Sequence, residues 1–186
     1  MKFRGLTLLV VGCCGIAWAA DNPAPAPKLT PIAADAQAGP HASAFAPLAY
    51  FNQNCARCHG EFGSFYGDDM GKDRDDASLR EVIDEMASGP GQAPLTPTEL
   101  DAVTAWHRAL RDKKPFVVIV KAEKTDAGWQ LSGEVSPDAT LQINGEAVAV
   151  KDANWTFCAA TDAVKLRATR GDAVTELDAN TAAFGP

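Results

Sequence analysis

Basic side chains are scarce relative to acidic ones in this 186-residue sequence. Lys and Arg number 17 against 24 Asp and Glu, so the formal net charge at pH 7 is −7. Proteins that bind nucleic acids neutralise phosphates with a surplus of Lys and Arg. The charge balance therefore excludes nucleic acid as an expected partner. The chain is long enough for one or two small hydrophobic cores.

The N-terminal apolar run is too short to cross a membrane. It extends from Leu6 to Ala20, whereas a transmembrane helix needs about 20 apolar residues. Lys2 and Arg4 precede the run, and Ala17-Trp18-Ala19 has the small-x-small pattern of a signal-peptidase site. We therefore expect residues 1–19 to be a signal peptide and the cleaved protein to be periplasmic or exported, with no transmembrane segment.

Cysteines are few, and two of the five leave with the predicted signal. Val10-Val11-Gly12-Cys13 also has the small-residue-then-cysteine character of a lipid-attachment site, so a lipid anchor at Cys13 stays open. The other three are Cys55, Cys58 and Cys158, an odd number for disulfide pairing. If Cys55 and Cys58 serve another purpose, Cys158 is a lone thiol, and we expect it to be buried in a strand.

The rest of the chain divides by its periodicity into a tether, a helical region and a β region. Residues 20–40 are rich in Pro and Ala and predict an extended tether. Apolar side chains recur at helical spacing in residues 41–114 and at a spacing of two in residues 115–186. We therefore expect an α+β protein of two domains, a small all-α domain followed by a small all-β sandwich.

Three helices are predicted in the helical region. The first covers Ala46–Cys55. Ser78 is expected to cap the second. Thr96 and Glu99 have the spacing of a capping box and predict the start of the third helix, which Pro115 ends.

Seven short strands are predicted in the β region, and Asn144-Gly145 is a strong hairpin-turn signal. This number of strands predicts a small sandwich with Trp129, Trp155 and Phe157 in its core. The pattern resembles the immunoglobulin-like or fibronectin-like modules of exported bacterial proteins. The region has no histidine and its acidic residues are scattered, so no catalytic cluster is expected there. The strands are expected at Phe116–Val120, Trp129–Val135, Thr140–Ile143, Ala147–Val150, Trp155–Ala159, Val164–Thr169 and Val174–Leu177.

The chemistry of the sequence is concentrated at Cys55-Ala56-Arg57-Cys58-His59. Two thiols separated by two residues lie about one helical turn apart, so both can form thioethers with the vinyl groups along one edge of a haem. His59 follows directly and can bring an imidazole to the iron. A zinc site would need further ligands, for which His41, His107 and Cys158 are the candidates, and a thioredoxin-like redox pair would need a βαβ context. The segment therefore predicts one covalently attached haem c.

The stretch from Leu48 to Leu110 resembles a short class I cytochrome c. It combines the Cys-Ala-Arg-Cys-His-Gly segment, a middle helix, a Gly-Pro loop and a final helix, and it covers about a third of the chain. The resemblance implies a small all-helical fold around haem, in which the first and last helices cross. It also implies that Cys55 and Cys58 are the thioether attachments and that His59 is the proximal iron ligand.

This sequence departs from the family at the sixth iron ligand. Class I cytochromes usually carry Met-Pro in the loop before the last helix, whereas this loop reads Gly-Pro-Gly-Gln-Ala-Pro and places Ala93 where the methionine would stand. An alanine methyl cannot bind iron. Met86 is the candidate distal ligand because it shares a helical face with the apolar residues of the middle helix. Met70, His107 and an open or water-bound position are alternatives that the sequence leaves open.

One-electron transfer between redox partners is the expected function, because thioether ligation favours a high reduction potential. Catalysis is not expected, since histidine is scarce and no distal acid–base pair is evident. The alternatives are a haem-based sensor or small-ligand-binding protein with an open sixth position, and the cytochrome subunit of a periplasmic oxidoreductase. We expect redox protein partners, docked through the β-sandwich. A basic partner is favoured by a crowded set of acidic residues at Asp68, Asp69, Asp73, Asp75 and Asp76.

Overall fold

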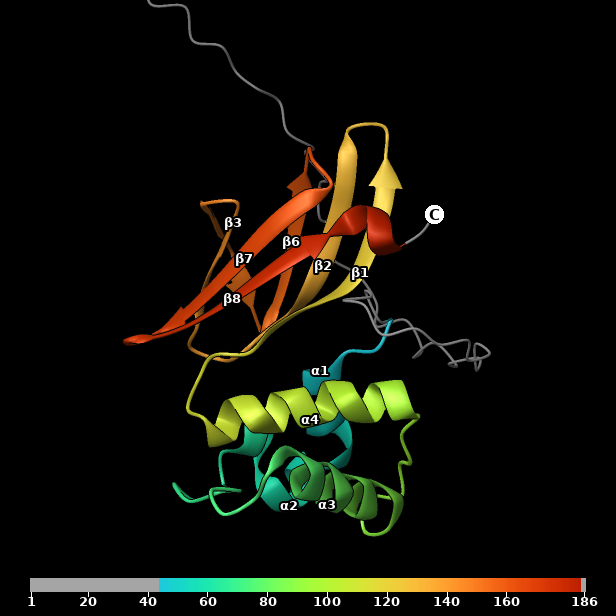
Figure 1. The fold of residues 1–186 in the computed structure, drawn as a ribbon, viewed down its shortest axis with the longest axis vertical. Coiled ribbons are helices and arrows are strands. Elements are labelled where there is room, and N and C mark those ends of the chain that lie inside the picture. The colour runs from blue at the N-terminus through green and yellow to red at the C-terminus, as the bar shows by residue number, and fades with distance from the viewer. Residues whose placement is uncertain (1–43, 185–186) are drawn as a thin grey trace, which may run out of the picture. The chain divides into compact units, whose positions relative to one another are not determined.

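The structure is a computed structural model that describes residues 44–184. The predicted signal peptide, the predicted tether, Cys13 and His41 lie outside the described residues. Helices precede strands, and the change falls between Arg111 and Val117 (Figure 1). The fold is therefore a mixed α+β fold whose C-terminal part is rich in β-strands.

The helical region contains short elements besides the three helices that the sequence predicts. The Cys-Ala-Arg-Cys-His segment forms a separate single turn, α2, directly after α1. A 3₁₀ turn follows it, and a second 3₁₀ turn at Thr181–Phe184 ends the described chain. The bounds are α1 Pro47–Asn54, α2 Ala56–His59, the first 3₁₀ turn Glu61–Gly63, α3 Asp76–Ser88 and α4 Pro97–Arg111.

Side-chain caps fix the starts of α3 and α4. The predicted capping box of α4 is confirmed, because Thr96 caps the helix and the Glu99 carboxylate accepts the Thr96 backbone N–H at 2.8 Å. The prediction that Ser78 caps α3 is wrong. Asp75 holds that position, and its carboxylate accepts the Ser78 backbone N–H at 2.8 Å. A carboxylate is the better group here because it also meets the positive end of the helix dipole.

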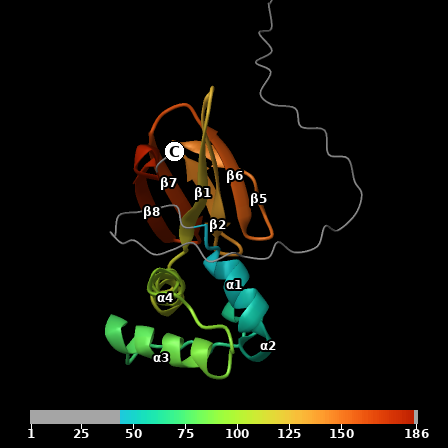
Figure 2. The ribbon, with the colours of Figure 1, turned by 90° about the vertical axis from the view of Figure 1, so that its right-hand side faces the viewer.

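The strands form two four-stranded antiparallel sheets, which lie face to face in Figure 2. Their orders are β1-β2-β6-β5 and β4-β3-β7-β8. The bounds are β1 Val117–Thr125, β2 Gly128–Val135, β3 Thr140–Ile143, β4 Glu146–Val148, β5 Val150–Lys151, β6 Asn154–Ala159, β7 Ala163–Arg170 and β8 Ala173–Asn180.

The prediction of a single strand over Ala147–Val150 is wrong. β4 pairs with β3 and β5 pairs with β6, so the chain passes from one sheet to the other between Val148 and Val150. The hairpin before this crossing is confirmed. Asn144 and Gly145 have φ values of 52° and 84°, as a two-residue turn of the favoured hairpin type requires.

A hydrophobic core lies between the two sheets and makes them a sandwich. Leu131 from one sheet and Leu166 from the other are fully buried in it. The predicted core positions of Trp129 and Trp155 are confirmed, and Phe157 is half-buried and packs against the same core. Burial of side chains of this size is the main favourable contribution to the folding of a small sandwich.

The prediction that Cys158 is buried is wrong. Cys158 lies in β6, as expected, but its side chain is exposed and its thiol is free. Side chains alternate between the faces of a strand, and the inner positions of β6 are taken by Trp155 and Ala159, which are buried. Cys158 therefore falls on the outer face together with Thr156, which is also exposed.

A second hydrophobic cluster joins the helices to the sandwich. Leu48 and Phe51 from α1 and Trp106 from α4 are buried with Phe116 and Ala153 from the β-rich part. The rings of Trp106 and Phe116 meet edge to face with centroids 5.7 Å apart, a favoured arrangement of aromatic pairs. The described helices and strands therefore share buried side chains and belong to one compact unit.

We predict that Cys158 reacts rapidly with a thiol reagent in the folded protein. Its exposed side chain leaves no packing to open first, so the rate should be close to that in the urea-unfolded chain. The measurement is thiol labelling followed by peptide mass spectrometry, with Cys158→Ser as the control. Labelling that requires denaturant would contradict the exposed position.

Candidate functional site

An apolar cavity lies among the helices. Its volume is about 800 Å³ when the space of its open mouth is included. Its walls come from α1, α2, α3, α4 and the loop that precedes α3. Aliphatic side chains dominate the far wall, which includes Leu79, Val82 and Ile83 of α3 and Val103 of α4.

The turn α2 brings two of the predicted site residues, Cys55 and His59, to this cavity, whereas Cys58 is not among the lining residues. The Cys55 carbonyl accepts the backbone N–H of Cys58 at 3.1 Å and of His59 at 3.0 Å, so one helical turn connects the three residues. Cys55 and His59 are half-buried and line the cavity. The Cys58 thiol is exposed, and both thiols are free. Burial, and next the neighbouring Cys58, raise the pKa of the Cys55 thiol.

Aromatic rings surround His59. The Tyr66 ring lies with its centroid 4.9 Å from that of the His59 imidazole, and Phe51 lies at 6.4 Å. Just after His59 the chain turns at Gly60, which has a φ of 74° and whose missing side chain leaves room for the Phe65 ring. These contacts confine the imidazole at the cavity wall from more than one side.

His107, which is buried, and Tyr66, which is half-buried, form a hydrogen-bonded pair in the same wall. His107 Nδ1 lies 2.8 Å from the Val103 carbonyl oxygen. A carbonyl only accepts, so this nitrogen carries the proton. Nε2 is then the acceptor for the Tyr66 hydroxyl at 3.2 Å. Burial lowers the pKa of His107 to about 4 and raises the pKa of Tyr66, so both side chains are neutral at pH 7.

Two methionines reach the cavity. Met86 lines it from α3 and is 42% exposed, whereas Met70 lines it from the loop before α3 and is half-buried. Met70 is one of the alternative iron ligands that the sequence leaves open, and its loop folds back to the cavity. Both methionines are therefore among the residues that line the cavity.

Hydrogen bonds to the backbone of Ala93 hold the loop that contains it in place. The Tyr50 hydroxyl donates to the Ala93 carbonyl, and the Ala93 N–H donates to the Ala87 carbonyl at 2.9 Å. Burial raises the pKa of the Tyr50 hydroxyl to about 12, so it stays protonated and able to donate. These bonds hold the segment in place although its side chain offers no iron ligand.

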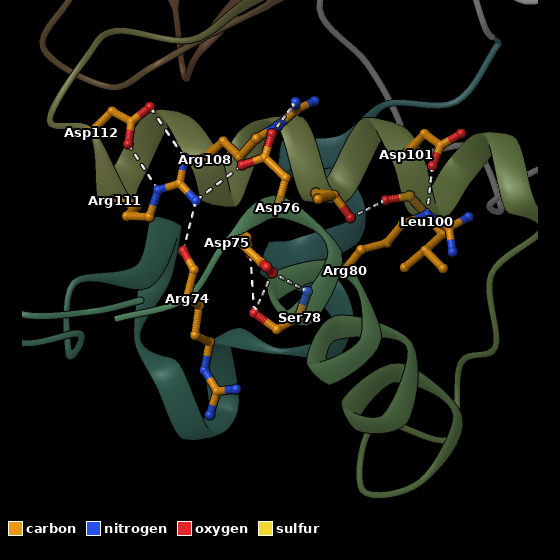
Figure 3. Close-up of polar contacts among 11 residues, drawn as sticks. Arg74, Asp75, Asp76, Ser78, Arg80, Leu100, Asp101, Arg108, Arg111 and Asp112 are labelled. Atoms are coloured by element: carbon orange, nitrogen blue, oxygen red, sulfur yellow. Dashed lines mark hydrogen bonds and ion pairs between the residues drawn. The ribbon is translucent and has the colours of Figure 1, made fainter. Parts of the chain in front are cut away.

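Of the crowded acidic residues, Asp76 links α3 to α4 through ion pairs (Figure 3). Asp76 pairs with Arg108 at 2.9 Å and with Arg111 at 3.0 Å. Arg111 also donates to the Arg74 carbonyl at 3.1 Å. Figure 3 shows that the Arg74 guanidinium extends away from α4. Arg74 also lines the cavity, where it is the one fixed cation among the described lining residues.

The lining groups are mostly apolar. They comprise aliphatic and aromatic walls, two imidazoles, two thioethers, a half-buried thiol and a guanidinium. Within residues 44–184, no three His, Cys, Asp or Glu side chains are grouped as a metal site would need. In the same part of the chain, no helix has the length and apolar character to span a membrane.

Comparison of the chain with models of protein families, with curated proteins and with solved structures gave no match.

The Tyr66–His107 pair is the part of the site that sequence reasoning missed. His107 lies at helical spacing with Leu100 and Val103 and is one of the alternative iron ligands that the sequence offers, but nothing in the sequence indicates its hydrogen bond with Tyr66. No comparable signal marks Tyr66, because it lies in a loop whose path depends on the cavity.

We predict that protonation of His107 weakens the fold in acid. Its pKa falls from 6.5 to about 4 on folding, so between these values the unfolded chain binds more protons. Stability is complete above about pH 6.5 and is lost as the pH falls towards 4, by about 3 kcal/mol. Urea unfolding at a series of pH values measures this slope.

The control for this slope is His107→Gln, which keeps hydrogen-bonding groups but does not titrate. The variant should flatten the pH dependence between pH 4 and 6.5. An unchanged slope in His107→Gln would show that another group causes it.

Proposed function

We propose that this protein is a c-type cytochrome that carries one haem. Cys55 and Cys58 would attach the haem through thioethers, and His59 would bind the iron. The observation that carries this proposal is the single helical turn from Cys55 to His59 at the wall of an apolar cavity. A bound haem supplies a reversible one-electron change at its iron.

The residues of the chain have separate roles in this proposal. The aliphatic side chains of α3 and α4 keep water from the cavity, which favours the less charged form of a redox centre. Tyr66 and Phe51 restrict the His59 imidazole. Arg74 is the lining cation suited to the propionate carboxylates of a haem.

One-electron transfer is the function that this site supports best. The Tyr66–His107 pair is neutral and mutually hydrogen-bonded, so it does not offer a free acid and a free base for catalysis. Met86 remains our candidate for the sixth iron ligand, and Met70 competes with it because both line the cavity. We further propose that the protein is exported and transfers electrons between redox proteins, with the sandwich available for docking.

A ligand-binding or sensor function is the second candidate. It is favoured by Ala93, which stands where the resemblance to class I cytochromes c expects the methionine ligand. An open sixth position would admit a small diatomic ligand, and the exposed fraction of Met86 is compatible with a side chain that does not bind the iron.

We predict that the pigment of the protein is covalently bound. The full chain is produced in cells competent in cytochrome c maturation and extracted with acidified acetone. The red pigment should stay with the wild-type polypeptide and with Cys158→Ser, the matched control. It should be extracted from the double variant Cys55→Ala/Cys58→Ala. Extraction of the pigment from the wild type, or a wild type without pigment, would reject the proposal.

The sixth ligand can be assigned by comparing Met86→Ala with Met70→Ala. Ligation by Met86 predicts that the thioether-to-iron charge-transfer band of the ferric protein is lost in Met86→Ala and retained in Met70→Ala. The opposite result assigns the ligand to Met70. A wild type without the band, whose reduced form binds carbon monoxide rapidly, would favour the ligand-binding function.

A further inference from the structure

Glu134 is buried where the strand pattern predicts exposure. Trp129, Leu131 and Val135 are the inward residues of β2 and are buried in the sandwich core. Glu134 is the neighbour of Val135 in β2, so its side chain should point to the outer face of the sheet. Glu134 is nevertheless only 2% exposed. A carboxylate is costly to bury unless its oxygens accept hydrogen bonds. Because Glu134 does not point into the sandwich core, the donors that satisfy its carboxylate must lie outside that core.

The explanation lies at the start of α1. Glu134 Oε2 accepts the backbone N–H of Leu48 at 2.8 Å, and Oε1 accepts that of Ala49 at 2.9 Å. Pro47, which has no N–H, is the first residue of the helix, so these N–H groups belong to the second and third helical positions. They are the two groups that an N-cap side chain normally satisfies.

α1 has no cap of its own. Its N-cap residue is Ala46, and no side chain of the local sequence bonds to the first turn. The helix also has no acidic residue in that turn to meet the dipole. Glu134, which follows Leu48 by 86 residues, supplies both the acceptor atoms and the negative charge.

α1 leads directly into the candidate site. The Cys55 N–H donates to the Phe51 carbonyl at 2.8 Å, so the last turn of α1 holds the first cysteine. The same helix packs Leu48 and Phe51 against Phe116 and Ala153 of the β-rich part. The hydrogen bonds at its start and the apolar contacts along its side both come from the sandwich.

We infer that Glu134 is a positioning residue through which the sandwich caps α1 and holds the Cys55–His59 turn at the cavity. The sandwich is then a structural part of the site as well as a surface for partners. The cap stands on the contacts of the chain alone, and its importance for haem rests on the proposed function.

The test is amide hydrogen exchange of the purified full chain as wild type and as Glu134→Gln. Glutamine keeps the size of the side chain but has one oxygen acceptor and no charge. Exchange at Leu48 and Ala49 should be about 10- to 100-fold faster, with a smaller increase at Cys55 and His59. Exchange in α4, at Val103 and Thr104, should not change.

Two further variants make the result specific. Glu146→Gln, an exposed glutamate on β4, is the matched control and should leave all these rates unchanged. Ala46→Ser places an ordinary N-cap on α1, and in the Glu134→Gln background it should restore most of the protection at Ala49.

The outcomes separate this inference from a general effect on stability. Unchanged exchange at Leu48 and Ala49 would overturn it. An equal acceleration throughout α4 and the sheets, or a failure of Ala46→Ser to restore protection, would also overturn it. A chain without covalent haem would reject the proposed function but would leave this measurement valid.

Discussion

The burial of Trp106 is the interaction on which the rest of the structure depends. This side chain is 1% exposed and packs in one cluster with α1 and with Phe116 of the β-rich part. Its indole N–H has no hydrogen-bond partner among the described residues, which costs about 1–3 kcal/mol. Truncating a buried Trp costs about 3–5 kcal/mol, so the apolar contacts outweigh that loss. The crossing of α1 and α4, and with it one wall of the cavity, follows from this packing.

The opposite wall of the cavity is held differently. α3 carries several ion pairs to α4. The pairs Asp76–Arg108 and Arg80–Asp101 join exposed side chains, and such pairs contribute about 0–1 kcal/mol each. Leu79 and Ile83 are buried against Leu100 and Val103 and contribute more. The ion pairs therefore affect the orientation of α3 more than the stability of its packing against α4. Met86 lies on α3, so its distance from His59 depends on these apolar contacts between α3 and α4.

The elements that sequence reasoning predicted correctly have local causes. The capping box at Thr96 and the turn at Asn144-Gly145 are set by residues within four positions of each other, and the alternation of the strands placed Trp129 and Trp155 correctly. The errors have two sources. Cys158 was assigned by its residue type, although the alternation of β6 placed it outside. The split of β4 from β5 depends on which sheet supplies each partner, and local sequence carries little of that information.

The same distinction between local and distant causes applies to the candidate site. Cys55, Cys58 and His59 could be proposed from the sequence because their spacing follows from one helical turn. Tyr66 and Glu134 could not, because their roles depend on residues 41 and 86 positions away. A glutamate at an outward strand position predicts a solvent contact unless the covering helix is known. The more distant a partner is in the chain, the less a single sequence says about the pair.

The separation between α1 and its cap has a consequence for biosynthesis. A ribosome releases the chain from its N-terminus, and domains form as their residues become available. Leu48 emerges 86 residues before Glu134, so the helix that leads to Cys55 is incomplete while most of the sandwich is still being synthesised. During this interval the two thiols belong to a segment whose helix has not yet acquired its distant cap.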